Sequence, residues 1–220
     1  MITAATALPL LGLRITAGPV ELRGITDDLF GPLAELAISG IHDPDFMPFS
    51  IPWSLTRAEE LPRTMAQFYW GRRAEFSPGM WSAEFAVSWE GELVGTQGMT
   101  TSEYLVTRTA ETGSWLGRRF QGRGIGTAMR QVICAFAVDH LDAECMTSGA
   151  FTDNAASLGV SKKVGYTENG RKRVARLGRP ATLQKMALMP ENLVRYEHPL
   201  VVDGLPEFRR SIGLDADGRT

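Results

Sequence analysis

The chain has 220 residues, of which 44% are hydrophobic and 22% charged, and its 23 lysines and arginines against 25 aspartates and glutamates give a net charge of −2. These values predict a globular protein of one domain, or of one domain with an appendage, and argue against a surface that attracts nucleic acid or anionic lipid as a whole. Two cysteines, Cys134 and Cys145, cannot form a disulfide framework and no apolar run is long enough for a membrane span, so we expect a reduced, cytoplasmic protein.

The first fifty residues predict a strand pair, a helix and a long loop. Residues 11–23 alternate loosely between apolar and polar side chains, which is typical of a strand or a hairpin. Residues 25–39 place apolar side chains at helical spacing, and Gly40 can end that helix. Residues 41–53 contain three prolines and four aromatic or methionine side chains. We therefore expect an irregular loop there that forms one wall of a binding site.

A second helix is predicted to end near Trp70, and its start has two alternatives. Thr56 and Glu59 have the spacing of a capping box, which would begin the helix directly after them. Pro62 conflicts with that start, because a helix tolerates proline only in its first turn. The alternative is a helix that begins near Leu61.

The rest of the domain predicts strands that alternate with helices. The predicted strands are Ser82–Trp89, Glu92–Met99, 109–117, Glu144–Phe151, Thr167–Val174 and Ala181–Leu188, and the predicted helices are Gly124–Val138 and Asn154–Val164. Because strands linked as hairpins are mixed with helices, we expect an α/β protein of the mixed α+β kind rather than a doubly wound parallel sheet.

The last thirty residues predict an appendage. We place the domain at 1–189 and a C-terminal, strand-containing tail at 190–220, because Leu200–Leu205 forms one more apolar run. Such a strand would be an exposed edge if it were left unpaired. We therefore expect it to extend the sheet or to pair with a second subunit in a homodimer.

The most informative segment joins a predicted strand to a predicted helix and carries glycines at 122, 124 and 126. Glycines let a ligand approach the backbone closely, and the first N–H groups of a helix are free to bind an anion, so we expect a phosphate site. The spacing fits neither the dinucleotide fingerprint, because Thr127 stands where its third glycine belongs, nor the P-loop, because no Gly-Lys-Ser/Thr follows.

Gln121-x-x-Gly124-x-Gly126 at the start of a helix resembles the acyl-CoA pyrophosphate loop of the GNAT N-acyltransferase superfamily. Other segments match that family in order, and together they cover residues 1–190: Ser114-Trp115-Leu116, Asn154-Ala-Ala-Ser157 and Lys163-Val-Gly165-Tyr166. The resemblance is nearest to the branch of the ribosomal-protein N-terminal acetyltransferases. Within it, His42-Asp43-Pro44, Met47-Pro48-Phe49 and Gly113-Ser-Trp-Leu-Gly117 resemble a subgroup that uses succinyl-CoA.

The resemblance implies a GNAT fold, with a central mixed, mostly antiparallel twisted sheet of about seven strands flanked by helices. It also implies that acetyl-CoA or succinyl-CoA is the acyl donor. The residues that it assigns to the donor are Trp115, Leu116, Gln121, Gly122, Arg123, Gly124, Ile125, Gly126, Thr127, Ala128, Asn154 and Ser157. Backbone N–H groups from Arg123 to Ala128 would bind the pyrophosphate, and Arg118, Arg119 and Arg123 would add positive charge or form a solvated surface cluster.

The family reaction is the direct attack of a primary amine on the thioester, which needs a base for the amine and an acid for the thiol. Ser157 is the candidate acid, although Asn154 and Ser157 also suit the start of a helix. Glu111 is the candidate base, with Glu103, Asp43 or an ordered water as alternatives. Tyr166 is expected to fill the core.

The acceptor is expected to bind against the 41–53 loop, through His42, Asp43, Phe49 and Trp53. His42 and Asp43 could form a hydrogen-bonded pair or serve only to hold the loop. A basic run around the last hairpin is either a solvated surface or an anion site, and it comprises Arg171, Lys172, Arg173, Arg176 and Arg179.

The sequence thus predicts a transfer of an acyl group to a small-molecule or peptide amine, without nucleic acid, membrane or metal; no His, Cys, Asp or Glu spacing fits a metal site. A non-catalytic module that binds or senses acyl-CoA is the alternative, since it would bind the donor without turnover. A nucleotide-dependent oxidoreductase is a third alternative, which the missing glycine at 127 disfavours.

Overall fold

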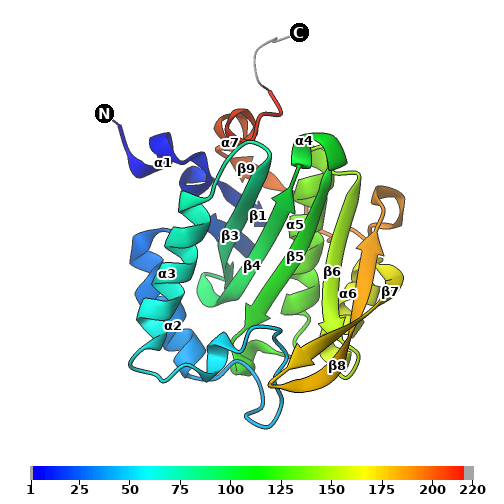
Figure 1. Ribbon diagram of the computed structural model, residues 1–220. Helices are drawn as coiled ribbons and strands as arrows, with labels where there is room; N and C mark the ends of the chain where they lie inside the picture. Colours follow the sequence, from blue (N-terminus) through cyan, green and yellow to red (C-terminus); the bar gives the residue numbers. More distant parts are fainter. Residues whose placement is uncertain (1, 216–220) are drawn as a thin grey trace.

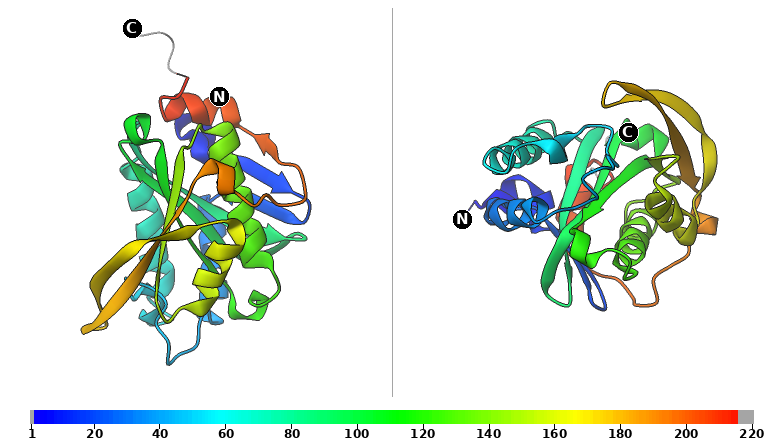
Figure 2. Two further views of the ribbon diagram at one scale, coloured as in Figure 1. Left: turned by 90° about the vertical axis from the view of Figure 1, so that its right-hand side faces the viewer. Right: turned by 90° about the horizontal axis from the view of Figure 1, so that it is seen from below.

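The computed structural model describes residues 2–215, and within them the chain forms one nine-stranded sheet with helices on both faces (Figures 1 and 2). The strands are β1 Arg14–Ala17, β2 Val20–Gly24, β3 Met80–Trp89, β4 Glu92–Ser102, β5 Thr109–Leu116, β6 Cys145–Phe151, β7 Thr167–Arg176, β8 Arg179–Leu188 and β9 Val201–Asp203. The helices are α1 Ala4–Ala7, α2 Phe30–Ile38, α3 Leu61–Ala74, α4 Tyr104–Thr107, α5 Ile125–His140, α6 Ala155–Val164 and α7 Leu205–Ser211, and short 3-10 turns span Pro9–Gly12, Asp27–Leu29, Trp53–Leu55, Arg118–Phe120 and Pro190–Asn192.

The strand order is β7-β8-β6-β5-β4-β3-β2-β1-β9, and every neighbouring pair is antiparallel except β5 and β6. The expected mixed α+β class and mostly antiparallel sheet are therefore confirmed. The expected number of about seven strands is wrong. One extra strand arises because Gly18, at φ 54°, turns residues 14–24 into the hairpin β1–β2, and the other is β9 in the tail.

The helices form two layers around the sheet. Seen along the sheet, α2 and α3 lie on one face, and α5 and α6 lie on the other (Figure 2). Helix α5 presents buried apolar side chains such as Val132, Ile133 and Phe136 to the main core. Helices α2 and α3 pack in a second apolar cluster, where Phe30 stacks on Tyr69 with 5.8 Å between ring centroids. Burial of these faces is the main source of stability for each layer.

Strands β5 and β6 separate along their length, and this separation creates room for a ligand. Their parallel pairing runs only from Thr109, opposite Cys145, to Glu111, opposite Thr147. Beyond these pairs β5 stays on β4 and β6 stays on β8, so the two strands run apart toward the lower edge of the sheet in Figure 1. The glycine segment and the start of α5 follow directly on the divergent end of β5.

Helix α3 begins at Leu61, with Pro62 in its first turn. The start near Leu61 is thus confirmed, and the capping box at Thr56 and Glu59 is wrong. Thr56 instead ends the 3-10 turn Trp53–Leu55 with an extended backbone, ψ 136°. A proline in the first helical turn lacks an N–H that would have no partner there anyway, so Pro62 fixes this start better than the distant Thr56.

The C-terminal segment packs onto the domain through β9 and α7. Strand β9 pairs antiparallel with β1, from Arg14 opposite Asp203 to Thr16 opposite Val201. Phe208 on α7 is fully buried against Trp81, with 5.8 Å between ring centroids. Of the two expectations for the tail, the structure contains the extension of the sheet; the division into a domain and a tail stays a prediction.

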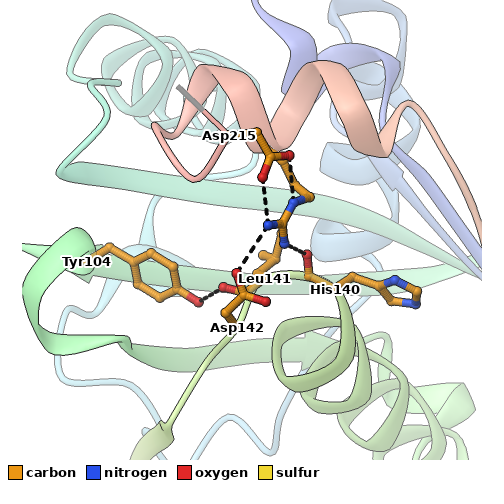
Figure 3. A network of polar contacts seen from close by, with 6 residues as sticks. Tyr104, His140, Leu141, Asp142 and Asp215 are labelled. Atoms are coloured by element: carbon orange, nitrogen blue, oxygen red, sulfur yellow. Dashed lines mark hydrogen bonds and ion pairs between the residues drawn. The ribbon is translucent and has the colours of Figure 1, made fainter. Parts of the chain in front are cut away.

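A polar network fixes α7 to the turn after α5 (Figure 3). The Arg209 guanidinium pairs with the carboxylates of Asp142, at 3.1 Å, and Asp215, at 2.8 Å, and also donates to the carbonyl of His140. The Tyr104 hydroxyl donates to the neighbouring carbonyl of Leu141 at 2.9 Å. This network joins three segments that are far apart in the sequence.

Candidate functional site

The glycine segment presents free backbone amides at the start of α5. Gly124 precedes α5 with φ 85°, a left-handed conformation that favours glycine. The amides of Thr127 and Ala128 already donate to the carbonyl of Gly124. Within the described residues, the amides of residues 122–126 have no backbone acceptor, so of the predicted set those from Arg123 to Gly126 are free to bind a phosphate.

A cavity of about 870 Å³ extends from this loop along the divergence of β5 and β6, and we call it the donor cleft. Most of the residues predicted to bind the donor line it: Trp115, Leu116, Gln121, Gly122, Gly124, Gly126, Thr127, Asn154 and Ser157. Arg123 does not line it, and the side chains of Ile125 and Ala128 are buried in the core. Ile125 can therefore contribute only through its backbone.

Gln121 connects the glycine segment to the 41–53 loop. Its side-chain amide donates to the carbonyl of Ile41 at 2.7 Å and to the carbonyl of Leu116 at 3.0 Å. The amide of Arg118 adds a bond to the carbonyl of Gly40 at 2.8 Å. These bonds attach the loop that carries the free amides to the 41–53 loop and to the end of β5.

The three arginines near this loop differ in their surroundings. Arg118 lines the donor cleft and pairs with Asp43 at 3.3 Å. Arg119 pairs with Glu92 at 2.9 Å and lies outside the cleft. Arg118 is therefore the one of the three that the structure brings to the cleft.

Asn154 and Ser157, at the start of α6, line the same cleft as the glycine segment. The side chain of Asn154 caps α6 by accepting from the amide of Ser157 at 3.1 Å, and Gly165 ends the helix with φ 108°. This capping accounts for both residue types by itself. Because both residues also line the cleft, the cap fixes their side chains beside the space that a donor would occupy.

His42 and Asp43 line the donor cleft, but their side chains do not pair with each other. His42 Nδ1 lies 2.8 Å from the backbone carbonyl of Asp43, and Nε2 lies 2.8 Å from the hydroxyl of Ser54. The carboxylate of Asp43 turns to Arg118 instead. The ring of His42 thus holds the loop in shape. Of the two alternatives for this residue, the structure contains this one and not the pair with Asp43.

A second cavity of about 350 Å³ lies on the face covered by α3, and we call it the acceptor pocket. Phe49, Trp53 and Trp115 form a continuous aromatic wall, with 5.3 Å between the first two ring centroids and 5.9 Å between the last two. The pocket shares Phe49, Gly113, Ser114 and Trp115 with the donor cleft. The two spaces therefore meet at the middle of β5.

Glu84 on β3 is a carboxylate in the acceptor pocket that sequence reasoning missed. Among the described residues it has no hydrogen bond or ion pair, and burial raises its pKa to about 7, although the positive charge of Arg72 opposes the shift. Its register partner is Gly98, whose own partner on β5 is Gly113. The signal in the sequence was a glutamate between Ala83 and Phe85, in a strand otherwise rich in apolar residues.

The predicted base, Glu111, does not lie in either of these spaces. It lines a third cavity, of about 520 Å³, together with Glu103, the alternative base. Glu103 directly precedes α4 and has φ 54°. Glu111 and the acceptor pocket occupy the same face of the sheet, but Glu111 is two residues before Gly113 on β5.

The predicted basic run lies on the β7–β8 hairpin, and none of its five side chains lines these three cavities. Arg171 donates to Gln184 at 2.9 Å, and Arg176 binds Asp153 through two bonds of 2.8 and 2.6 Å. Lys172, Arg173 and Arg179 are exposed. Most of the basic run is thus a solvated surface, which is the first of the two alternatives.

A different arginine reaches the cleft. Arg130 on α5 is 4% exposed and lines the donor cleft, and its acceptors among residues 2–215 are all neutral. Its partners are Gln97 at 3.3 Å, Ser148 at 3.1 Å and Ser114 at 2.9 Å. The side-chain amide of Gln97 in turn donates to the carbonyls of Gly98 and Gly113, both at 3.0 Å. This network therefore holds β4 and β5 in place where the two cavities meet.

Tyr166 and Cys134 lie in the core, as expected. The Tyr166 hydroxyl lies 3.0 Å from Thr112 Oγ1 and 3.3 Å from Cys134 Sγ. Burial raises the pKa of the Cys134 thiol to about 11, so this thiol is a poor nucleophile at neutral pH.

Within residues 2–215, no group of three or more His, Cys, Asp or Glu side chains is placed to hold a metal ion. None of the helices in the same residues has the length and apolar character that crossing a bilayer requires.

Comparison with known proteins agrees with this geometry. A family model described as the acetyltransferase (GNAT) domain matches residues 20–167. YdaF of Bacillus subtilis, whose name describes a ribosomal N-acetyltransferase, is 29% identical over 90 residues, 41% of this chain and 49% of that protein. The match thus spans about half the length of this curated relative.

Two solved structures show the same fold. Mycobacterium smegmatis RimJ in complex with CoA-disulfide matches with a TM-score of 0.68 at 20% identity, over 84% of this chain and 88% of that one. The Salmonella typhimurium acetyltransferase that modifies the N-terminal serine of ribosomal protein L7/L12 matches with a TM-score of 0.63 at 18% identity, over 78% and 95% of the two chains.

Proposed function

The chain belongs to the GNAT acetyltransferase family, and we propose that it is an acyl-CoA-dependent N-acyltransferase that acts through a ternary complex. The amine nitrogen attacks the thioester carbon, the C–N bond forms, the C–S bond breaks and the thiol of coenzyme A leaves. The observation that carries this proposal is the junction of the donor cleft and the acceptor pocket at Gly113, Ser114 and Trp115. A donor and an acceptor that enter from opposite sides of β5 can meet there without a covalent enzyme intermediate.

The residues of the donor cleft fit coenzyme A. Free amides of residues 122–126 lie at a cleft of about 870 Å³, and the dipole of α5 adds partial positive charge at its N-terminus. In this proposal the amides bind the pyrophosphate, Gln121 positions their loop and Arg118 adds charge. Asn154 binds the pantetheine or the adenosine phosphate region.

The catalytic residues that the sequence predicts are part of the proposal. Ser157 protonates the leaving thiolate from the first turn of α6, a position next to the cleft. Glu111 is the base that the sequence predicts, although it lines the neighbouring cavity, and Glu111→Gln tests whether it takes the proton of the amine. Phe49 and Trp53 shape the space for the acceptor, and His42 and Asp43 hold the loop that carries them.

The donor is acetyl-CoA or succinyl-CoA in this proposal. One residue of the cleft, Arg130, can distinguish between these two donors. Succinyl carries a carboxylate, and Arg130 is a buried cation in the cleft whose partners Gln97, Ser114 and Ser148 are all neutral. A carboxylate that reached Arg130 would gain a charge-assisted bond that acetyl cannot make. A succinyl-CoA Kd below that of acetyl-CoA, and a loss of that preference in Arg130→Lys, would assign succinyl.

The acceptor is a primary amine on a peptide or a small molecule. The names of the relatives, which refer to ribosomal proteins, favour a peptide or protein amine. We further propose a cytoplasmic homodimer, and light scattering of the full chain after gel filtration measures the number of subunits.

Thiol release tests the function as a whole. The purified protein is mixed with acetyl-CoA or succinyl-CoA and a panel of primary amines, and the free thiol of coenzyme A is measured with a chromogenic disulfide. Thiol release that depends on an amine, with the acylated amine detected by mass spectrometry, supports the transferase. Donor binding without amine-dependent release would assign the chain instead to the non-catalytic acyl-CoA-binding module.

A further inference from the structure

On the basis of the proposed function, we infer that the acceptor is a primary amine with one positive charge on a compact apolar group, that Glu84 binds its ammonium, and that Glu84 takes its proton. The inference concerns the acceptor pocket, whose volume of about 350 Å³ lies within the usual range of small-molecule sites.

The walls of the pocket are apolar. Aromatic and aliphatic side chains from three elements surround the space: Phe49, Ile51 and Trp53 before α3, Phe68 on α3, and Trp115 on β5. Ile51 is 73% exposed and Phe68 is 46% exposed, so the apolar surface continues to the mouth of the pocket. An apolar group on the acceptor would bury this surface, and the aromatic faces also attract a cation.

The charge in the pocket is a single carboxylate. Glu84 lines it, whereas no lysine, arginine or histidine of the described residues does. An acceptor with a carboxylate of its own would face Glu84 without a cation to balance it. A polyamine would bring several charges into a space with one anion, and its remaining ammonium groups would lose water without a partner.

The position of Glu84 relative to the junction suits proton transfer. Its carboxylate lies over Gly98, where the absence of a side chain leaves room for it. Gly98 pairs with Gly113 on the next strand, and an added Cβ at Gly113 would meet no atom within 4 Å. A nitrogen above Gly113 is therefore about one strand spacing, about 4.8 Å, from the carboxylate, which is the separation that one bridging water spans.

Glu84 fits the role of base better than Glu111. Both are strand carboxylates on the face of the sheet that α3 covers, but only Glu84 lies in the cavity that meets the donor cleft. The charged or titratable groups that act on Glu84 are Arg72 and Tyr69, both from α3. Burial keeps the Tyr69 hydroxyl neutral by raising its pKa, so Arg72 is the cation that influences the carboxylate.

The proton balance closes without a further reactant. The bound ammonium gives one proton to Glu84 and becomes a nucleophilic amine. The nitrogen attacks the thioester carbon, the C–N bond forms and the C–S bond breaks. The second proton leaves the new amide nitrogen for the thiolate, directly or through Ser157, and Glu84 later releases its proton to water.

The test begins with binding. Phenethylamine, a peptide with an N-terminal phenylalanine, L-phenylalanine and spermidine are titrated into the intact protein, with the fluorescence of the pocket tryptophans as the signal. We expect phenethylamine or the phenylalanine peptide to bind at least about tenfold more tightly than spermidine and L-phenylalanine, as one charge-assisted contact accounts for such a factor. The two preferred ligands distinguish a free amine from a peptide N-terminus.

The variant Glu84→Gln keeps the shape of the side chain and removes its charge. We expect it to weaken binding of the preferred amine about tenfold and to lower kcat by at least about 100-fold, while the Kd of the acyl-CoA changes less than about twofold. Glu35→Gln is the matched control, since Glu35 is an exposed carboxylate on α2 outside the three cavities, and we expect it to behave as the wild type.

Preference for spermidine or L-phenylalanine, or activity of Glu84→Gln within about threefold of the wild type, would overturn the inference. A wild-type protein that binds no acyl-CoA and releases no thiol would instead overturn the proposed function. Amine binding that depends on Glu84 is measured without a donor, so the two failures are distinct.

Discussion

The carboxylate of Glu84 lies directly over Gly98, its partner across the β3–β4 ladder, so closely that a Cβ at position 98 would overlap Oε2 and lie 2.9 Å from Cδ. The glycine is therefore needed for the position of the carboxylate rather than for a turn. Because Gly98 also pairs with Gly113, a row of one carboxylate and two bare backbone positions crosses three strands and ends where the acceptor pocket meets the donor cleft.

Gly98→Ala should displace Glu84 without unfolding the protein, because the group that must move is the end of a flexible side chain. We expect kcat/KM for the amine to fall roughly 10- to 100-fold, since small displacements of a reacting group are costly, and the Kd of the acyl-CoA to stay unchanged. Steady-state kinetics and donor titration measure the two effects. Gly71→Ala on α3, where a Cβ meets nothing within 4 Å, is the control, and equal kinetics in the two variants would contradict the account.

The pH dependence of activity should follow Glu84. Its pKa of about 7 means that the carboxylate is protonated below that pH and ionised above it, and only the ionised form can bind an ammonium and accept its proton. We therefore expect kcat/KM for the amine to rise as the pH increases from 6 to 8, and this rise to be absent in Glu84→Gln. An unchanged profile in the variant would assign the base elsewhere, with Glu111 as the next candidate.

Whereas activity should rise with pH, the free energy of unfolding of the wild type should fall. Folding raises the pKa of Glu84 from 4.5 to about 7, so the native state keeps a proton that the unfolded state has lost, and the wild type loses stability as the pH rises between these values. Glu84→Gln carries no such charge. We expect it to be more stable than the wild type by on the order of 2 kcal/mol at pH 8 and about equal at pH 4.5, by urea denaturation. A variant that is less stable at pH 8 would show that the carboxylate has a structural role.

Local signals in the sequence predicted much of the fold and of the donor cleft. Helix α6 begins after Asn154 and ends at Gly165 as expected, because the capping side chain and the left-handed glycine act within a few residues. The glycine segment was found for the same reason. What the sequence could not predict depended on distant partners: the place of Glu84 follows from its register with Gly98. Of the two expectations for the tail, the pairing of β9 with β1 gives the extension of the sheet.

The prediction of Glu111 as the base was limited in the same way, because local patterns do not show which distant segments surround a residue. Alternation along β5 correctly places Glu111 on the face that α3 covers, but it cannot say which cavity a position on that face will line. Of the two alternatives for His42, the structure does not contain the pair with Asp43, because Asp43 pairs with Arg118, 75 residues away along the chain.

Gly124→Ala tests the amide site. Gly124 has φ 85°, so alanine there strains the turn that presents the free amides, at a cost of about 1–2 kcal/mol. We expect the Kd of the acyl-CoA to rise about tenfold, as measured by calorimetry. Gly178→Ala on the β7–β8 turn carries the same kind of strain, with φ 74°, away from the cleft, and should leave the Kd unchanged. Equal Kd values for both variants would argue against phosphate binding by this loop.

Arg209→Ala tests the attachment of the C-terminal helix. Removing the guanidinium leaves Asp142, Asp215 and the carbonyl of His140 without their shared partner (Figure 3). We expect the free energy of unfolding to fall by about 1–2 kcal/mol and donor binding to persist. Arg210→Ala removes only an exposed pair with Glu207 and should cost at most about 0.5 kcal/mol. Equal losses in the two variants would mean that the network does not hold α7.

The most direct test of the proposed function is a calorimetric titration of the intact protein with acetyl-CoA, succinyl-CoA and coenzyme A. We expect one of the two acyl-CoA donors to bind with micromolar affinity or tighter, and Gly124→Ala to weaken this binding. No binding of any of the three ligands would contradict the assignment of the glycine segment as the donor site, and with it the acyltransferase function.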